Sequence, residues 1–339
     1  MNYTRQTVFI MATCLLAGSW AGCNNNGNEQ KHEQAGAKET TPAKSLNIPV
    51  FDADSAYEYV ARQVAFGPRT PGSESQRKCA AWMDEMLKKV CDTVYRQEAN
   101  VKGGDGKSLP CINLIGVINP SAAKRILLLT HWDSRPWADQ DTKDQDKPIL
   151  AADDGGSGVG VLLELARQLK AYHLPANIGI DILFTDVEDY GRSEWGEQSY
   201  CLGTQYWAHH PHVAGYRADY GILLDMVGGR GAQFPMEGSS MKFAADVQQK
   251  VWKAAAEAGF TSYFPYSQGA DITDDHVPVN TIAGIRTIDI ISLTPDPNKP
   301  FPEHWHTHAD VMQVIDKGTL KAVGQTLLQT IFEEQAGGS

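Results

Sequence analysis

Four short apolar runs, separated by helical patterns, constrain the fold of this chain more than any other feature. The runs are Ile126–Leu129, Ile178–Phe184, Ile222–Leu224 and Ile285–Ile291. Runs of this length are typical of strands that are buried on both faces. Segments with helical apolar spacing separate them, at Val159–Leu169, Gly203–His209 and Met241–Ala258. Strands that alternate with helices predict an α/β domain with a mainly parallel sheet and helices on both faces.

The remaining patterns fit around this sheet. Further helices are predicted at Asp54–Phe66, Ser73–Lys89 and Lys317–Glu334. Strand patterns at 93–99 and 112–118 flank the glycine-rich loop Gly103–Gly106 and predict a hairpin. Together the patterns predict a single domain, residues 48–339, with a mixed, mainly parallel central sheet flanked by helices.

The first 47 residues are predicted to carry targeting signals and a linker. Arg5 is the only charge among the first 22 residues, and the apolar run Val8–Ala17 follows it. Small residues then lead to Cys23, a pattern that resembles the signal of a bacterial lipoprotein in which Cys23 is lipidated. We therefore predict a signal peptide at 1–22, a flexible tether at 23–47 and a lipid-anchored protein of the bacterial cell envelope that faces the periplasm. The alternative is a plain secretory signal without the lipid.

Composition excludes one class of partner and leaves one question open. The chain has 41 Asp and Glu against 30 Lys and Arg, a formal net charge of −11, and no concentrated basic segment. A surface that binds nucleic acid is therefore not expected.

Four cysteines lie in the predicted domain, at Cys79, Cys91, Cys111 and Cys201. Export permits disulfides, but the spacing does not decide between bridges and buried free thiols.

Histidine and carboxylate side chains follow the apolar runs at the points where strands end. These groups are His131, Asp133, Glu188, Asp189 and Asp225. In an open α/β sheet, ligands bind outside the carboxyl ends of the strands, so these side chains should share one edge. Two more contributions are predicted there: Asp153-Asp154 at the start of a helix, and the loop Phe301–His308 with three histidines.

This set of side chains favours a metal. Histidine with carboxylates, in the absence of a cysteine cluster, is typical of a catalytic zinc that keeps one coordination position open. Other motifs do not fit: HExxH is absent, and Gly155–Gly158 matches neither a nucleophile elbow nor a dinucleotide-binding loop. The histidines at 209, 210 and 212 lie beyond a helix pattern and are predicted to be solvated.

In their order along the chain, these segments resemble the zinc aminopeptidase-like family, which includes two-zinc aminopeptidases and animal-type glutaminyl cyclases. The resemblance covers the chain from about Phe66 to the end. It is carried by His131–Arg135, Asp153-Asp154, Glu188-Asp189, Leu224–Met226, Asp274–His276 and Phe301–Thr307. Three of its features, Asp274–His276, Trp305–Thr307 and Trp195, resemble the cyclase branch, here in the form of a bacterial lipoprotein.

The resemblance assigns roles to residues. The implied zinc ligands are Asp154, Asp189 and His306. The implied catalytic groups are Glu188, which transfers a proton, and the supporting carboxylates Asp225 and Asp274. The implied pocket walls are Trp195, Phe301 and Trp305. The sequence departs from the animal pattern at two positions. Asp189 stands in place of the more usual Glu, and Asp289 stands where a strand histidine is expected.

The cyclase branch implies one zinc ion and substrates that are peptides or proteins with an amino-terminal Gln. The α-amine of that Gln attacks its own side-chain carboxamide, which gives pyroglutamate and ammonia. The alternative is an aminopeptidase in which His131 and Asp225 hold a second zinc, Asp154 bridges the two ions and Asp133 orients His131. A non-catalytic envelope binding protein is a third hypothesis, but it would be expected to have lost ligands, and none is missing.

Overall fold

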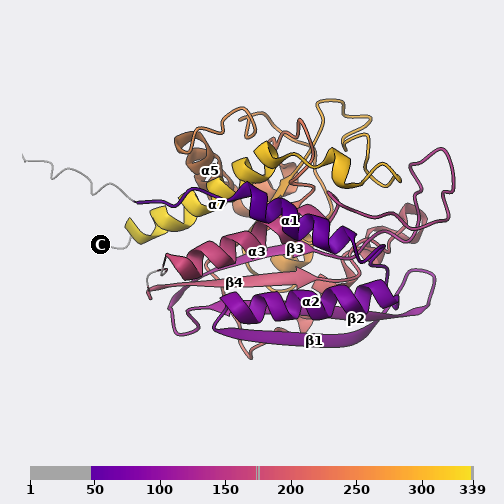
Figure 1. Ribbon diagram of the computed structural model, residues 1–339, viewed down its shortest axis with the longest axis horizontal. Coiled ribbons are helices and arrows are strands. Elements are labelled where there is room, and N and C mark those ends of the chain that lie inside the picture. Colours follow the sequence, from indigo (N-terminus) through magenta and orange to yellow (C-terminus); the bar gives the residue numbers. More distant parts are fainter. Residues whose placement is uncertain (1–46, 173, 175, 337–339) are drawn as a thin grey trace, which may run out of the picture. The chain divides into compact units, whose positions relative to one another are not determined.

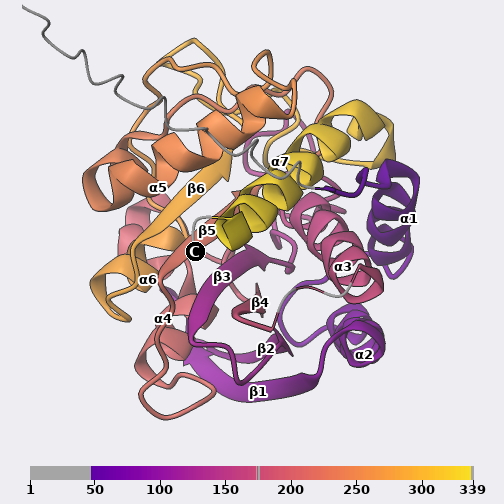
Figure 2. The ribbon, with the colours of Figure 1, turned by 90° about the vertical axis from the view of Figure 1, so that its left-hand side faces the viewer.

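The structure is a computed structural model that describes residues 47–172, 174 and 176–336. The predicted signal peptide, and the tether up to residue 46, lie outside the described residues. The described chain forms one compact unit, a six-stranded sheet with helices against both faces (Figures 1 and 2). None of its described helices is both long enough and apolar enough to cross a membrane.

The sheet has the strand order β1-β2-β4-β3-β5-β6. Its strands are β1 (Thr93–Lys102), β2 (Ser108–Ile118), β3 (Lys124–His131), β4 (Ile178–Thr185), β5 (Tyr220–Asp225) and β6 (Thr287–Ile291). β3 pairs in parallel with β4 and β5, and β5 pairs in parallel with β6, whereas the pairings β1–β2 and β2–β4 are antiparallel. The predicted mixed, mainly parallel sheet and the predicted hairpin are therefore confirmed.

Except for the short helix His276–Thr281, which no sequence pattern predicted, the α-helices occur where the periodicity predicts them, with shifts of a few residues at their ends. They are α1 (Ala53–Val64), α2 (Glu74–Val90), α3 (Gly156–Ala171), α4 (Leu202–His209), α5 (Gly238–Glu257), α6 (His276–Thr281) and α7 (Lys317–Ala336). Short 3₁₀ helices lie at η1 (Ser193–Trp195), η2 (Glu197–Ser199) and η3 (Met312–Val314). Ser73 caps α2, because its hydroxyl accepts a hydrogen bond from the Gln76 amide at 2.9 Å.

Side chains of the central strands alternate between two cores. In β3, Ile126 and Leu128 pack in the larger core, beneath α1, α2, α3 and α7, whereas Leu127 and Leu129 pack in a smaller core with Trp207 of α4. Figure 2 shows α4 and α6 on the opposite side of the sheet from α1, α2 and α3. Burying each leucine contributes about 1.5–3 kcal/mol. Strands packed on both faces make a rigid base for the side chains at their ends.

The cysteine question is settled for the described domain. Its four cysteines are all free and buried. They are Cys79 and Cys91 in and just after α2, Cys111 in β2, and Cys201 immediately before α4.

Candidate metal centre

One edge of the sheet gathers the predicted site residues. His131 ends β3, Asp225 ends β5, and Glu188 and Asp189 follow β4. Asp154 precedes α3, Asp274 precedes α6, and His306 lies in the loop that follows β6. The carboxyl ends of parallel strands meet at one edge, which is why segments far apart in the sequence converge there.

Asp154 is placed by a tight turn into α3. Gly155 has a φ of 83°, a conformation that L side chains rarely adopt. A Cβ on Gly158 would lie 2.1 Å from the Thr130 hydroxyl oxygen, so only glycine lets α3 start this close to β3. The Asp310 carboxylate accepts hydrogen bonds from the amides of Asp153 and Asp154 at 2.7 and 3.1 Å. The conformation of the turn is therefore fixed by the close contact of α3 with β3 and by the Asp310 carboxylate.

Asp154, Asp189 and His306 form a first group, which we call the His306 group. His306 Nε2 lies 3.3 Å from Asp189 Oδ1 and 3.7 Å from Asp154 Oδ2. Ligand atoms around a tetrahedral zinc at about 2.0–2.1 Å stand about 3.3 Å apart, so this spacing fits zinc. Oδ2 of Asp154 and Oδ2 of Asp189 are buried and have no hydrogen-bond partner. Orphaned buried carboxylate oxygens are what a metal would satisfy.

Arg135 and Asp139 hold the His306 group in place. The Arg135 guanidinium donates to Asp189 Oδ1 at 2.7 Å and to both oxygens of Asp139 at 2.7 and 2.8 Å. Asp139 Oδ1 lies 3.4 Å from His306 Nδ1, so the ring nitrogen that faces away from the group meets a carboxylate. Metal-bound histidines usually have such a partner, which fixes the ring orientation. Sequence reasoning missed Asp139, because it lies in a loop with no periodic pattern.

The electrostatics of this group favour ionised ligands. Burial alone would raise the pKa of Asp189, but the neighbouring His306 and Arg135 outweigh burial and lower it. Burial likewise opposes ionisation of Asp139, yet its hydrogen bonds with Arg135 and His306 hold the pKa of Asp139 well below its usual range. Metal ligands must be deprotonated, and the lowered pKa of Asp189 favours that form in this candidate ligand.

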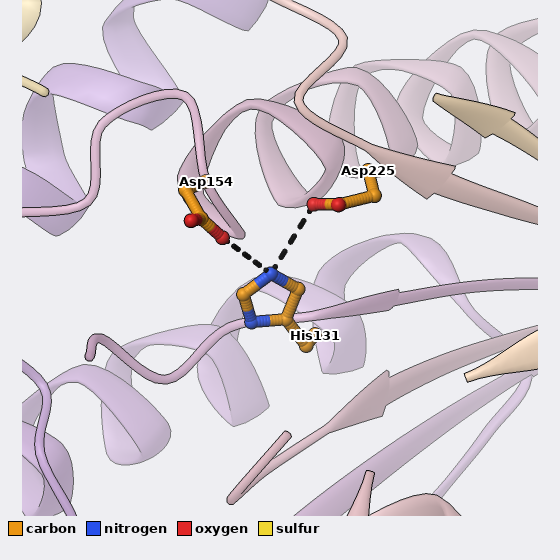
Figure 3. A group of neighbouring side chains, drawn as sticks. All are labelled: His131, Asp154 and Asp225. Carbon is orange, nitrogen blue, oxygen red and sulfur yellow. Dashed lines mark hydrogen bonds and ion pairs between the residues drawn. The ribbon is translucent and has the colours of Figure 1, made fainter. Parts of the chain in front are cut away.

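His131, Asp154 and Asp225 form a second group, which we call the His131 group (Figure 3). His131 Nε2 lies 3.0 Å from Asp154 Oδ1 and 3.3 Å from Asp225 Oδ1, and its Nδ1 lies 3.4 Å from Asp133 Oδ1. Burial opposes protonation of the ring, but the three carboxylates raise the pKa of His131 well above its ordinary value. A protonated ring can therefore neutralise these carboxylates. Asp154 belongs to both groups and offers one oxygen to each.

Asp133 connects the two groups. Besides facing His131, its carboxylate accepts hydrogen bonds from the backbone amides of Glu188 at 3.0 Å and Asp189 at 3.1 Å. Asp133 was predicted only as a partner of His131. In the structure it also fixes the turn after β4 that carries the proton-transfer candidate and one zinc ligand.

Glu188 and Asp274 stand beside the His306 group with Cys201. One ligand atom of each of these three residues lies within 4.8 Å of the others. Burial raises the pKa of Glu188 well above its usual value, and the negative charges of Asp189 and Asp274 add to the rise. Burial also raises the pKa of the Cys201 thiol far above its usual range, which favours the protonated form of this sulfur. The three residues are better suited to hold and move a proton.

A cavity of about 70 Å³ opens onto these side chains. Phe301 and Trp305 form its aromatic wall, with ring centroids 4.3 Å apart, and Trp305 stacks on the His306 ring at 3.7 Å. Sequence reasoning missed four other lining residues, because they carry no chemistry that a motif would show: Tyr200, Ile272, Thr273 and Ile291.

The resemblance assigned Trp195 to the pocket wall, and that role stays a prediction. The structure places it in η1, where it packs against Trp137 and Tyr190 at 5.8 and 6.1 Å, and not among the residues that line the cavity. The 3₁₀ turn after Asp189 carries its indole toward the β1–β2 hairpin, where its side chain lies against Gly104. The loop after β6 therefore supplies Phe301 and Trp305 to the cavity, and the segment before α4 adds Tyr200.

Two other predicted features lie outside the cavity. His209 and His210 are exposed, and none of the three metal-capable groups among the described residues includes them or His212. Asp289 lies in β6, fully buried, with Oδ2 3.9 Å from His276 Nδ1.

Comparisons with known proteins agree with this geometry. A family model described as Peptidase family M28 matches residues 113–331. A glutaminyl-peptide cyclotransferase of Gloydius blomhoffii is 26% identical over 249 residues, and the chain spans 65% of the length of this curated relative. That stretch is 65% of the present chain.

Two solved structures are similar over nearly their whole length. The crystal structure of Bacteroides thetaiotaomicron glutaminyl cyclase bound to N-acetylhistamine is 49% identical, with a TM-score of 0.81. The crystal structure of a Zn-dependent exopeptidase from Parabacteroides distasonis is 48% identical, also with a TM-score of 0.81. Each similarity covers 84% of this chain and 99% of the other chain.

Proposed function

Because this chain belongs to peptidase family M28, we propose that it cyclises the amino-terminal Gln of peptides and proteins to pyroglutamate and releases ammonia. Similarity to a glutaminyl cyclase along 99% of that chain supports this activity. The observation that carries it is Glu188, which lines a small cavity beside the candidate zinc ligand Asp189. A cavity of this size suits the end of one residue and does not suit a peptide that passes through.

The cofactor is zinc, and the residues that would hold it are those of the His306 group. Their spacing and their orphaned oxygens fit one tetrahedral ion with an open position. We propose one ion per chain, since a protonated His131 can already neutralise Asp225 and one oxygen of Asp154. The chemistry that a bound zinc supplies is polarisation of the substrate's amide oxygen and stabilisation of the charge that develops there.

Glu188 moves the proton in this proposal. The substrate amine must lose a proton as it attacks, and the departing nitrogen must gain one, so a single group can serve both steps. A carboxyl group whose pKa is raised by burial takes up a proton more readily than an exposed one, and it can return that proton. The Asp133 carboxylate accepts the Glu188 amide and so fixes the backbone of this residue, and the Asp274 carboxylate lies within 4.8 Å of its side chain.

Phe301 and Trp305 would hold the substrate in a folded, reactive geometry. Both reacting groups belong to one residue, so the pocket needs only to bring the amine and the carboxamide together. The aromatic wall also limits the access of water, which would otherwise hydrolyse the amide.

A two-zinc aminopeptidase is the second candidate function. The observation that favours it is Asp154, whose two oxygens face the two groups and could bridge two ions. The similarity to a Zn-dependent exopeptidase agrees with it. If this chain were a two-zinc aminopeptidase, its His131 and Asp225 would be ligands of the second ion.

The deciding experiment is incubation of the purified zinc protein with a Gln-initiated peptide. The expected product is the peptide less one ammonia, with no free amino acid released, while the same peptide starting with Leu stays intact. Glu188→Gln should keep its zinc and lose about 10²–10⁴-fold in kcat. Release of free amino acids from either peptide would favour the aminopeptidase.

We also propose that the protein is exported to the bacterial cell envelope and anchored there by a lipid on Cys23, facing the periplasm. The support is the signal-like sequence at 1–22 and the polar tether after it. Cys23→Ser should move the protein from the membrane fraction to the soluble periplasmic fraction. A wild-type protein without a lipid at the mature amino terminus would contradict the anchor.

A further inference from the structure

The carboxylate of Glu188 has an unusual partner, the thiol of Cys201. Cys201 Sγ lies 3.4 Å from Glu188 Oε1, and this is the one hydrogen bond to that carboxylate among the described residues. A thiol is a weak donor, and it is seldom placed opposite a group that must carry a proton. A thiol is therefore an unexpected partner for a carboxylate that transfers a proton.

The thiol acts as a hydrogen-bond donor in this contact. Cys201 is 2% exposed, and burial is the main cause that raises its pKa far above the usual value, with the neighbouring Glu188 adding to the rise. A cysteine thiol with its ordinary pKa of about 8.5 is already mostly protonated at neutral pH, and burial favours the same form. A protonated, buried thiol is neither a nucleophile nor a metal ligand, but it can donate its S–H to a carboxylate oxygen.

The backbone forces the two residues together. The Cys201 amide donates to the Glu188 carbonyl at 2.9 Å, and the Leu202 amide donates to the Val187 carbonyl at 3.1 Å. A Cβ on Gly203 would lie 2.0 Å from the Asp186 carbonyl oxygen, so the start of α4 touches the turn after β4. This close approach is built into the fold and does not depend on the thiol.

The segment is also strained where the two residues meet. Val187 and Cys201 both have a φ of 55°, which is rare for residues other than glycine and costly for the β-branched Val187. Such strain persists only when the surrounding structure fixes it. Asp133 fixes one side by accepting the Glu188 amide, and the segment 201–203 fixes the other.

We propose that Cys201 is a positioning residue for proton transfer. Its S–H holds Oε1 of Glu188, so the carboxylate keeps one rotamer and the second oxygen serves the substrate. A weak donor orients the carboxylate and leaves it free to take up a proton, whereas an ionic partner would hold it ionised. This inference rests on the proposed function, because it takes from it the role of Glu188.

Replacing the thiol should separate donation from packing. Cys201→Ala removes the donor, and we expect kcat to fall about five- to tenfold with KM little changed. Cys201→Ser keeps a donor at the same position and should restore most of kcat. If Cys201 only filled space, both smaller residues would behave alike, and the polar Ser would be the worse of the two.

Cys91 offers a matched control. It is also a buried free thiol, at the end of α2 against Gly116 and away from the cavity. Cys91→Ala and Cys91→Ser should leave kcat and KM unchanged. Zinc content and Tm of each variant show whether the fold is intact.

Infrared spectroscopy of the S–H stretch gives a readout that needs no turnover. The Cys201 band is assigned by its loss in Cys201→Ser. We expect it at a lower frequency than the other three thiols, and Glu188→Ala should shift it to the frequency of a thiol without an acceptor. The inference is overturned if the frequency of the Cys201 band is the same in Glu188→Ala as in the wild type. It is also overturned if the protein is a cyclase and Cys201→Ala leaves its kcat unchanged. A wild-type protein that shows the band shift but releases no ammonia contradicts the proposed function instead.

Discussion

The His306 group and the His131 group contain the same residue types, one histidine and two aspartates, and they share Asp154. They differ in what surrounds them. In the His131 group three carboxylates face the ring and raise the pKa of His131. In the His306 group Arg135 supplies a cation to Asp189 and Asp139. Ligand types alone therefore do not distinguish the two groups; the neighbouring charges do.

The two groups also differ in their support. His131 and Asp225 stand at the ends of β3 and β5, which are packed on both faces. Asp189 and His306 stand in connecting segments, and His306 has a φ of 55°. A strained ligand on a loop must be held by its neighbours, which here are Asp139 and Trp305. The comparison predicts that the His306 group depends on its surroundings more than the His131 group does.

The largest effect should come from removing the histidine of the proposed zinc site. His306→Ala leaves two carboxylates for the ion, and we expect zinc content to fall from about one per chain toward zero and kcat/KM to fall about 10³-fold or more. Metal analysis of the purified variant and a kinetic assay for ammonia release test this. Wild-type zinc content in His306→Ala would place the ion elsewhere.

A smaller effect should follow from loosening His306 without removing it. Asp139→Asn takes away the charge that faces His306 Nδ1 and one of the two hydrogen bonds from Arg135. We expect zinc affinity to fall about 10–100-fold, which competition with a chelator measures. The matched control is Asp246→Asn, which alters an exposed aspartate of α5 that also accepts two hydrogen bonds from an arginine, Arg286, and does not line the cavity. Equal affinities in the two variants would mean that Asp139 does not orient the ligand.

The link between the groups can be tested at Asp133. Asparagine has one acceptor oxygen, so Asp133→Asn breaks at least one of the hydrogen bonds from the Glu188 and Asp189 amides. We expect the free energy of unfolding to fall by about 1–3 kcal/mol and kcat/KM to fall about tenfold. Denaturant titration of the zinc protein measures the free energy of unfolding, and steady-state kinetics measure kcat/KM. A change in stability without any change in kcat/KM would contradict the positioning role.

Much of the fold could be predicted because its signals are local. The apolar runs of β3 and β4 and the carboxylates that follow them appear directly in the sequence. The convergence of these carboxylates at one edge follows from the rule for parallel strands. Asp154 could be anticipated in the same way, since it precedes the helical pattern of α3.

The supporting contacts could not be predicted, because they depend on how loops fold back. No local pattern places Asp139 against His306, or Cys201 against Glu188. Trp195 is a similar case: its chemistry suits a pocket wall, and no local pattern shows that η1 places it against Gly104 of the β1–β2 hairpin. Residue type indicates what a side chain can do, and only the path of the chain decides where it acts.

The smallest effect on activity should come from His131. If the ring only neutralises Asp225 and Asp154, His131→Gln keeps one zinc per chain and loses less than tenfold in kcat/KM. The metal-free variant should nevertheless lose about 3–5 kcal/mol of stability near pH 6, because it leaves buried carboxylates without their cation. The pKa of His131 is raised in the fold, so the ring stabilises fully below its ordinary pKa of 6.5 and less as pH rises through the folded value. The difference in stability should therefore shrink at alkaline pH. The opposite outcome would be two zinc ions in the wild type, with one ion and no activity in His131→Gln. That outcome would show that both groups bind a zinc ion that activity requires.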